Sequence, residues 1–588
     1  MTEGHGAKKG AGGVGDPRIV RRPAKAVPAG LRALHPVLAR VYGSRALLDS
    51  SELDHSFARL LSPDGLKGMD AATALLVQAL DARWRILVIG DFDADGATSC
   101  AVACRALRDM GAEDVDFLVP NRFTFGYGLT PEIVEVAARA RPDLIVTVDN
   151  GISSLAGVDA ARARGMAVLI TDHHLAGDVL PAADAIVNPN QPGDGFASKN
   201  LAGVGVIFYV MLALRAQLRA RGWFARRGLQ EPNLARLLDL VALGTVADVV
   251  PLDANNRILV AQGLKRIRQG ESCPGIVALL EAGGRTPGRV TAADLGFVAG
   301  PRLNAAGRLE DMSLGIACLL AGEAMHAYEL AQQLDRLNRE RRLIEAGMQE
   351  QALDALRLLE LDAQLPAGLC LFDDSWHQGV IGILAGRIRE RVNRPVIAFA
   401  PAGEHELKGS ARSVAGLHIR DTLDAVAARH PELLQRFGGH AMAAGLTIAR
   451  SCLEPFRQVF AEEVGHRLGR ESLQGEIVSD GELAGPEITL ELAELLRDGG
   501  PWGQGFPEPV FDGVFEIAGT RTVGANHLRL VLQHPDGALL DAIAFNQADG
   551  AWQPGQQVRA AYRPDVNHFQ GNRALQLVVT QLWPLAQS

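Results

Sequence analysis

The feature of this chain that most constrains its fold is a series of short, apolar, β-branched runs between residues 85 and 250. Amphipathic, helix-like stretches separate these runs. Strands that alternate with helices imply right-handed βαβ crossovers, and hence a parallel sheet. The runs are RILVIG (85–90), LIVTVDN (144–150), AVLITDHH (167–174) and AIVNPN (185–190). The sequence therefore predicts an α/β domain built on an open parallel sheet.

The rest of the chain predicts further domains, because 588 residues exceed the ~250 to 300 that one hydrophobic core supports. A helical period over 326–360 predicts one long connecting helix. Strand, helix and strand patterns over 368–401 open a second, smaller α/β domain, and strand-like runs beyond 511 predict an OB-type barrel. We expect a disordered basic tail (1–34), a catalytic domain (35–325), the connecting helix (326–362), the smaller domain (363–466) and the barrel domain (467–588).

Polar side chains follow the predicted strands at the points where the strands end. In an open parallel sheet, ligands bind beyond the carboxyl ends of the strands. Carboxylates that converge there repel one another unless cations neutralise them, and carboxylates with a few imidazoles suit Mn²⁺ or Mg²⁺. These residues are Asp91, Asp93, Asp95, Asp149, Asp172, His173 and His174, together with Asp248 after an apolar run. The pattern predicts a site for two divalent cations.

Each of these motifs has an ordinary alternative explanation. Asp-x-Asp in a loop is more often a solvated turn than a metal site, and a histidine at a strand end can be a capped surface residue. Three separate strand ends that all carry metal-type ligands are much harder to explain by packing alone. The combination therefore favours the metal interpretation.

Charge and composition exclude several classes of protein. The net charge of −9 and pI near 6.0 argue against a uniformly basic nucleic-acid coat, so a polyanion would need a local groove or metal ions. Six scattered cysteines without a CxxC motif suggest neither a disulfide framework nor a thiolate zinc site. The N-terminus lacks the apolar stretch of a signal peptide, and we expect a soluble, cytoplasmic protein that binds no membrane.

Several motifs resemble those of a known superfamily. The motifs GDFDADGATS (90–99), VDNGI (148–152), TDHH (171–174), GTVAD (244–248) and GPRLNAAGR (300–308) are similar to those of the DHH phosphoesterases. KGSARS (408–413) and FGGHAMAAG (437–445) are similar to the companion DHHA1 domain. From about residue 35 to 585, barrel included, the chain resembles the RecJ family of bacterial exonucleases specific for single-stranded DNA.

The resemblance implies roles for the strand-end residues. Asp93, Asp95, His173 and Asp248 match metal ligands, and Asp149 matches the ligand that bridges two ions, Mn²⁺ or Mg²⁺. Asp91 and His174 match positions at the same centre, either as ligands or just outside it. Asp172 would fix the tautomer of an imidazole. The implied catalytic residues are Asp149, Asp172, His173 and His174.

Substrate binding requires positive groups, and we expect the candidate arginines to lie in Gly-containing loops, where backbone amides also reach an anion. Any single arginine is more often in a surface salt bridge, and a buried, hydrogen-bonded histidine is the alternative for His440. Ser410 and Arg412 alternate in a strand-like segment, so both would lie on one face and could bind a 5′-phosphate. The candidate phosphate-binding residues are Arg122, Arg302, Arg308, Ser410, Arg412 and His440. In the barrel, Phe545, Tyr562, Phe569 and Trp583 are either core residues or stacking faces for bases.

The resemblance implies a single-strand-specific 5′→3′ exonuclease that releases 5′-mononucleotides in DNA repair and recombination. It also implies a monomer that works with a helicase and a single-strand-binding protein. One alternative is a DHH phosphodiesterase acting on short oligoribonucleotides or cyclic dinucleotides, although such relatives usually lack the terminal barrel. A non-catalytic replisome scaffold of the same fold is the other, although scaffolds tend to lose metal ligands.

Overall fold

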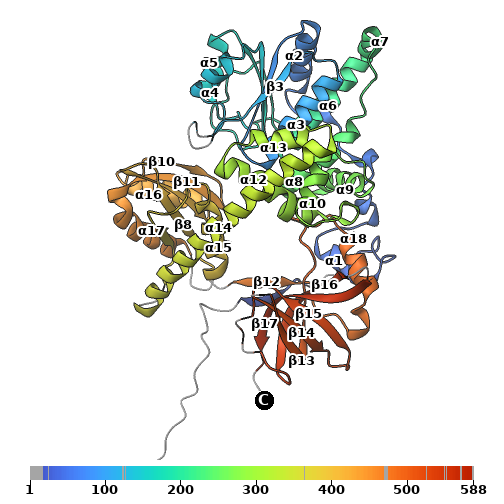
Figure 1. Cartoon of the computed structure of the whole chain (residues 1–588), viewed down its shortest axis with the longest axis vertical. Coiled ribbons are helices and arrows are strands. Elements are labelled where there is room, and N and C mark those ends of the chain that lie inside the picture. The colour runs from blue at the N-terminus through green and yellow to red at the C-terminus, as the bar shows by residue number, and fades with distance from the viewer. Residues whose placement is uncertain are drawn as a thin grey trace, which may run out of the picture. The chain divides into compact units, whose positions relative to one another are not determined.

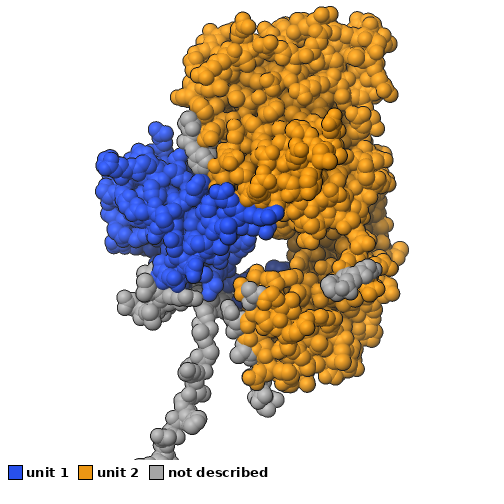
Figure 2. All heavy atoms as spheres, in the orientation of Figure 1, with its two compact units in different colours: residues 1–21, 339–479 blue, residues 22–338, 480–588 orange. Residues whose placement is uncertain are grey.

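A computed structural model describes residues 17–23, 26–121, 125, 127–362, 365–468, 475–524, 526–548, 550, 552–569 and 572–585. The chain divides into two compact units, each built from two separate segments (Figure 2). Unit 1 comprises Met1–Arg21 and Arg339–Ser479, and unit 2 comprises Arg22–Asn338 and Asp480–Ser588.

Unit 2 contains the predicted parallel sheet (Figure 1). Its five strands have the spatial order β3-β2-β4-β5-β6, and every neighbouring pair is parallel. Their bounds are β2 (Ile86–Gly90), β3 (Val115–Leu118), β4 (Leu144–Val148), β5 (Ala167–Thr171) and β6 (Ala185–Val187). β2 and β4 are buried at every residue, which explains their continuous apolar runs. The strand order reverses between β2 and β4, and this switch point is where such sheets bind ligands.

Helices cover both faces of this sheet, so successive strand residues enter different cores. Ile86 and Val88 belong to the core formed with α2 (Met69–Asp81), α3 (Ala94–Asp109) and α6 (Gly203–Ala220). Leu87 and Ile89 pack instead with α4 (Pro131–Ala138) and α5 (Leu155–Ala163). The remaining helices are α1 (Pro36–Ser44), α7 (Trp223–Arg227), α8 (Leu238–Ala247), α9 (Ala254–Arg268), α10 (Pro274–Ala282), α11 (Ala292–Asp294), α12 (Gly300–Leu309) and α13 (Ser313–Leu320).

Among the described residues, α6 is the one helix with the length and hydropathy of a possible membrane span. More than half of this helix, 61%, is buried inside the protein, which is equally typical of a core helix.

The predicted long helix is α14 (Ala324–Asp362), whose 39 residues pass from unit 2 into unit 1. Unit 1 contains the expected smaller α/β domain, with a five-stranded mixed sheet of order β10-β11-β9-β8-β7. The strands are β7 (Leu369–Phe372), β8 (Val396–Pro401), β9 (Glu406–Arg412), β10 (Arg436–Gly439) and β11 (Ala443–Ala449). The helices are α15 (Ile381–Val392), α16 (Ile419–Arg429) and α17 (Leu453–Arg467).

The expectation of a disordered tail up to residue 34 is wrong in part. Arg18–Arg21 form β1, which pairs in parallel with β12 (Glu476–Ser479), and α1 follows before residue 45. A partner strand more than 450 residues away cannot be recognised from four residues of local sequence. Residues 1–16 lie outside the described part of the chain.

The C-terminal barrel is confirmed as a closed sheet of order β13-β14-β15-β17-β16 in unit 2. Tyr562 is fully buried in its core, whereas the Phe545 side chain is 49% exposed and Trp583 is half-buried. Its elements are α18 (Leu490–Asp498), β13 (Phe511–Val523), β14 (His527–Gln533), β15 (Leu539–Ala544), β16 (Gln557–Phe569) and β17 (Asn572–Pro584).

Candidate metal centre

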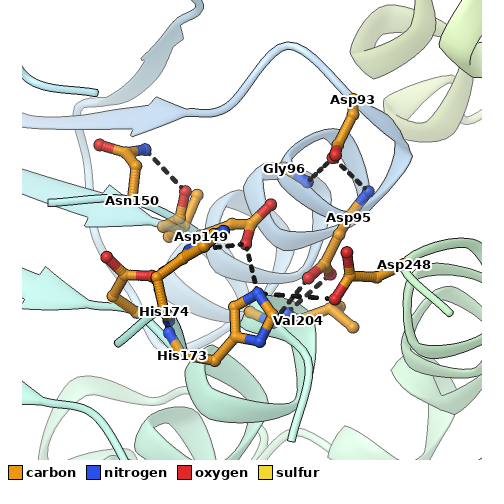
Figure 3. Close-up of polar contacts among 12 residues, drawn as sticks. Asp93, Asp95, Gly96, Asp149, Asn150, His173, His174, Val204 and Asp248 are labelled. Atoms are coloured by element: carbon orange, nitrogen blue, oxygen red, sulfur yellow. Dashed lines mark hydrogen bonds and ion pairs between the residues drawn. The ribbon is translucent and has the colours of Figure 1, made fainter. Parts of the chain in front are cut away.

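The predicted metal-ligating side chains meet beyond the carboxyl ends of β2, β4 and β5 (Figure 3). The possible ligand atoms form three sets, and the atoms within each set lie within 4.8 Å of one another. Asp149 belongs to two of these sets and His173 also belongs to two. The sets are Asp91 with Asp93 and Asp149, Asp95 with His173 and Asp248, and Asp149 with His173 and His174. We call these seven residues the strand-end cluster. Neighbouring donor sets with shared members are the arrangement that two adjacent cations require.

Backbone donors hold the first carboxylates in place. Asp93 caps α3, where its Oδ1 accepts hydrogen bonds from the backbone N–H groups of Asp95 (2.9 Å) and Gly96 (3.1 Å). Asp95, in the first turn of α3, is buried, and its two carboxylate oxygens accept hydrogen bonds from the backbone N–H groups of Gly203 (2.6 Å) and Val204 (2.9 Å) at the start of α6. A Cβ on Gly203 would lie 2.5 Å from the Cβ of Asp149, so this position requires glycine. Neither donor was predicted, although the LAGVGV segment (201–206) at the start of this apolar helix was a usable signal.

Asp149 adopts an unusual backbone conformation at the end of β4. Its φ angle is +62°, in the left-handed region that non-glycine residues rarely adopt. The Asn150 side chain donates to the carbonyl oxygens of Ile89 (3.1 Å) and Val148 (2.9 Å) and thereby connects the ends of β2 and β4. Neighbouring contacts thus hold a strained residue at the centre of the cluster, as is common at functional sites.

The two histidines differ in their surroundings. Nε2 of His173 lies 3.1 Å from Asp149 Oδ1 and 3.5 Å from Asp248 Oδ2, and Figure 3 shows its ring pointing toward both carboxylates. His174 instead places Nδ1 2.8 Å from Oδ1 of Asp172. Asp172 also accepts backbone hydrogen bonds from Ile152, His173 and His174. Asp172 therefore orients the His174 ring, which is the contact its predicted role requires.

Electrostatics indicate a site built for cations. Burial, and then the neighbouring Asp93 carboxylate, raises the pKa of Asp95 to about 7. Burial, followed by repulsion from Asp95, raises the pKa values of Asp149 and Asp248 well above the ordinary range. Asp172 behaves differently: burial acts to raise its pKa, but the hydrogen bond with His174, the charges of His174 and His173 and the backbone N–H of Ile152 together outweigh burial and lower the pKa. Crowded carboxylates with unfavourable charge, and donors that are mostly oxygen, fit Mn²⁺ or Mg²⁺.

These shifts predict how the stability of the metal-free protein depends on pH. A carboxyl whose pKa is raised in the folded state makes its full contribution to folding stability below its unfolded pKa of ~3.9. This contribution is lost as pH rises through the folded-state pKa. For Asp95 the loss extends from about pH 4 through about pH 7. In EDTA, the Tm should therefore fall between pH 5 and pH 8, and Mn²⁺ should reverse the fall. Asp149→Asn should show a smaller decrease. A decrease of equal size in the wild type and the variant would contradict this account.

The GPRLNAAGR motif forms helix α12 and not the phosphate-binding loop that we expected. Arg302 is only 7% exposed, forms an ion pair with Asp335 (2.8 Å) and donates to the Val298 carbonyl (2.7 Å). Its guanidinium is thus used inside the helical layer, and we do not extend the phosphate-binding proposal to it. Arg308 is half-buried in the last turn of α12. Arg122 lies outside the described residues.

The motif instead supports the loop that carries the first aspartates. Oδ1 of Asn304 accepts a hydrogen bond from the backbone N–H of Ala94 (2.8 Å) in the first turn of α3. A Cβ on Gly307 would collide with the carbonyl oxygen of Phe92, so glycine permits this close approach. Asn304 and Gly307 are therefore packing residues of the site that the sequence analysis did not identify.

In unit 1, Ser410 and Arg412 lie side by side on β9, as their alternation predicts. Nη1 of Arg412 donates to Ser410 Oγ (3.2 Å). A Cβ on Gly382, in the first turn of α15, would lie 2.9 Å from both Nη2 of Arg412 and Oγ of Ser410. Burial, and then Arg389, lowers the pKa of Arg412. A helix start beside a hydroxyl and a guanidinium can bind an anion. His440 is exposed between β10 and β11.

Tyr127 is a further residue of the centre that the sequence analysis missed. Its hydroxyl lies 3.2 Å from the Asp149 carbonyl oxygen and 3.1 Å from Nδ1 of His174. Partial burial, and then repulsion from Asp172 and the other carboxylates, raises the pKa of Tyr127 well above the ordinary value. Its hydroxyl therefore keeps its proton at neutral pH.

Comparisons with known proteins agree with this architecture. Residues 85–245 match the DHH family N-terminal domain, 365–466 the DHHA1 domain and 479–581 the RecJ OB domain. The single-stranded-DNA-specific exonuclease RecJ of Dickeya dadantii is 56% identical, over 94% of this chain and 97% of the relative. The RecJ of Escherichia coli is 53% identical, over 94% of this chain and 96% of the relative.

A solved structure gives the same result in three dimensions. RecJ from Thermus thermophilus in complex with Mn²⁺ is 31% identical and superposes with a TM-score of 0.78, covering 97% of this chain and 79% of the other. A second structure of that protein is a complex with Mg²⁺. The sequence identities to these relatives, the three matched domains and the shared fold show that this chain belongs to the RecJ family of single-stranded-DNA-specific exonucleases.

Proposed function

We propose that this chain removes 5′-mononucleotides from the 5′ end of single-stranded DNA by two-metal-ion hydrolysis, in DNA repair and recombination. The observation that carries the proposal is the strand-end cluster, in which two neighbouring donor sets share Asp149. The metal-bound structures of the Thermus thermophilus relative support Mn²⁺ or Mg²⁺ as the ions. A cytoplasmic monomer acting with a helicase and a single-strand-binding protein is part of the same proposal.

In this proposal the described side chains have separate roles. Asp91, Asp93 and Asp149 would hold one cation, and Asp95, His173 and Asp248 would hold the other, with Asp149, whose Oδ1 lies 3.1 Å from Nε2 of His173, placed to reach both. When bound, two such cations would lower the pKa of a water molecule, so that it supplies the attacking hydroxide, and would neutralise charge that develops on the phosphate oxygens. Asp172 keeps His174 oriented at the edge of the cluster. In unit 1, Ser410 and Arg412 would bind the terminal 5′-phosphate.

A nuclease assay on a labelled single strand tests this function. We expect mononucleotide release with Mn²⁺ or Mg²⁺, no release in EDTA, and loss of release when the 5′ end, but not the 3′ end, is blocked. Release from the 3′ end would refute the polarity. Activity confined to short oligoribonucleotides or cyclic dinucleotides would favour a small-substrate phosphodiesterase, and inactivity in every metal would favour a scaffold.

The barrel offers an exposed patch for the strand, which we call the barrel patch: Arg521, His527, Arg529 and Phe545. Arg521 and Arg529 are directly opposite each other on β13 and β14. Arg529 also pairs with Asp541 (3.0 Å), which offsets part of the repulsion between the two guanidinium groups, and a phosphate between them would offset the rest. The His527 and Phe545 rings are in contact, with their centroids 5.2 Å apart, and Phe545 is exposed enough to stack on a base.

The double substitution Arg521→Ala with Arg529→Ala should weaken the binding of long single strands. The slope of log K against log salt is negative, and each lost phosphate contact makes it shallower by about 0.7. The double substitution should therefore reduce its magnitude by about 1.4. Fluorescence anisotropy on a labelled strand at several salt concentrations measures both quantities. Arg573→Ala is the matched control, because Arg573, like Arg529, is a barrel arginine with an acidic partner, Glu494, but lies outside the barrel patch. An unchanged slope in the double variant would show that the patch does not bind DNA.

A further inference from the structure

The Tyr127 side chain connects two strand ends of the metal centre. Its hydroxyl oxygen lies 3.2 Å from the Asp149 carbonyl oxygen at the end of β4. The same oxygen lies 3.1 Å from Nδ1 and 3.3 Å from Nε2 of His174, which follows β5. The Tyr127 ring packs edge-on against His174, with centroids 5.6 Å apart, and against Phe92 at 6.2 Å. Aromatic packing and polar contacts thus fix this side chain from three directions.

The hydrogen-bonding capacity of these groups determines what the hydroxyl can do. Oδ1 of Asp172 lies nearest to Nδ1 of His174, at 2.8 Å, so Nε2 is the ring nitrogen left for Tyr127. A phenol has one hydrogen to donate and lone pairs with which to accept. It can donate to Nε2, or donate to the Asp149 carbonyl while it accepts from a protonated Nε2. In both arrangements one oxygen contacts the ring of His174 and the backbone of Asp149.

The need for such a contact follows from the two residues that it joins. A hydrogen bond at Nδ1 permits the partly exposed His174 ring to tilt about that bond, so a second polar contact on the ring restrains its orientation further. Asp149 has a left-handed backbone, and such a conformation persists where its surroundings hold it in place. A second contact on each of these residues would maintain the geometry that hydrolysis requires.

We propose that Tyr127 is a positioning residue, whose hydroxyl holds the His174 ring in its working orientation relative to Asp149. This inference rests on the proposed nuclease function. Tyr127 then acts through His174 and does not contact the substrate by its hydroxyl. Losing a hydrogen-bond partner of this kind costs about 10- to 100-fold in activity at metal sites. The loss should fall on kcat, because substrate binding does not use the hydroxyl.

Tyr127→Phe tests the proposal, because it removes the hydroxyl and keeps the ring that packs against Phe92 and His174. At saturating Mn²⁺ we expect kcat on a single-stranded DNA substrate to fall at least about tenfold, with unchanged KM and Tm. Tyr328→Phe is the matched control: Tyr328 has the same exposed fraction, 48%, and lies on α14 outside the strand-end cluster. We expect this control to keep the wild-type kcat.

A double-mutant cycle with His174→Ala distinguishes positioning from other roles. If Tyr127 acts through His174, Tyr127→Phe should cause little further loss in the His174→Ala background. Equal losses in both backgrounds, an increase in KM without a decrease in kcat, or unchanged activity would each overturn the proposal. If the wild type itself released no nucleotides, the proposed function would fail, and that result is visible before any variant is compared.

Discussion

Replacing Asp149 with alanine should reduce hydrolysis by at least about 10³-fold, the size of effect seen when a principal catalytic group is removed. Asp149 belongs to two of the three donor sets, so its loss would damage both cation positions. The fold should survive, because removing one carboxylate from a cluster that raises its own pKa values relieves repulsion in the metal-free protein. Single-turnover nuclease assays in Mn²⁺, combined with thermal unfolding in EDTA, measure the two effects separately.

The backbone of Asp149 determines the better control for this experiment. Its φ angle of +62° is unfavourable for alanine, whereas asparagine tolerates the left-handed region. Asp149→Asn therefore removes the charge with the shape and backbone preference retained. We expect it to be as inactive as Asp149→Ala and at least as stable as the wild type in EDTA. Wild-type turnover by either variant in Mn²⁺ would end the two-metal hypothesis.

Replacing Arg412 with alanine should impair cleavage selectively on strands that carry a 5′-phosphate. A charge-assisted hydrogen bond contributes about 1.5 to 3 kcal/mol, which corresponds to about 10- to 150-fold in kcat/KM. The Arg412 guanidinium and the Ser410 hydroxyl lie beside each other at the start of α15, where a terminal phosphate could be bound. A strand with a 5′-hydroxyl lacks the extra charge and oxygens, so its cleavage should be affected far less.

Two further variants make this test specific. Arg412→Lys keeps the charge but loses the planar fork, so it should recover part of the preference for a 5′-phosphate. Ser410→Ala should have a smaller effect in the same direction. Equal losses on the two substrates would make Arg412 a general backbone contact or a structural residue. End recognition would then have to be assigned to other residues.

The sequence predicted those parts of the fold that rest on local patterns. The strands β2, β4, β5 and β6 were recognisable because buried strands of a parallel sheet are continuously apolar. The strand β3 was missed because its sequence, VDFL, includes an exposed aspartate. Helix α12 was mistaken for a loop because glycine and proline interrupt its sequence, although Gly307 is there to approach the Phe92 carbonyl.

The same distinction applies to the metal centre. Charged residues that directly follow a strand can be recognised one strand at a time, and every strand-end aspartate named in advance lies in or beside the cluster. The groups that hold them in place carry no charge and come from distant segments. Gly203 and Val204 contribute only backbone N–H groups, and Tyr127 approaches from a segment before α4. Apart from the LAGVGV segment (201–206), local patterns do not mark such partners, because tertiary folding brings them together.

The division of unit 2 into two separate segments has a consequence for biosynthesis. A ribosome completes residues 22–338 and then residues 339–479, the larger segment of unit 1, before it reaches the barrel. The apolar cluster that contains Leu240 of the catalytic domain also contains Phe515 of the barrel, so this core closes only when the last hundred or so residues emerge. Contacts that span such sequence distances form slowly. A nascent chain that stops early therefore leaves apolar surface of the catalytic domain uncovered, as a target for chaperones and proteases.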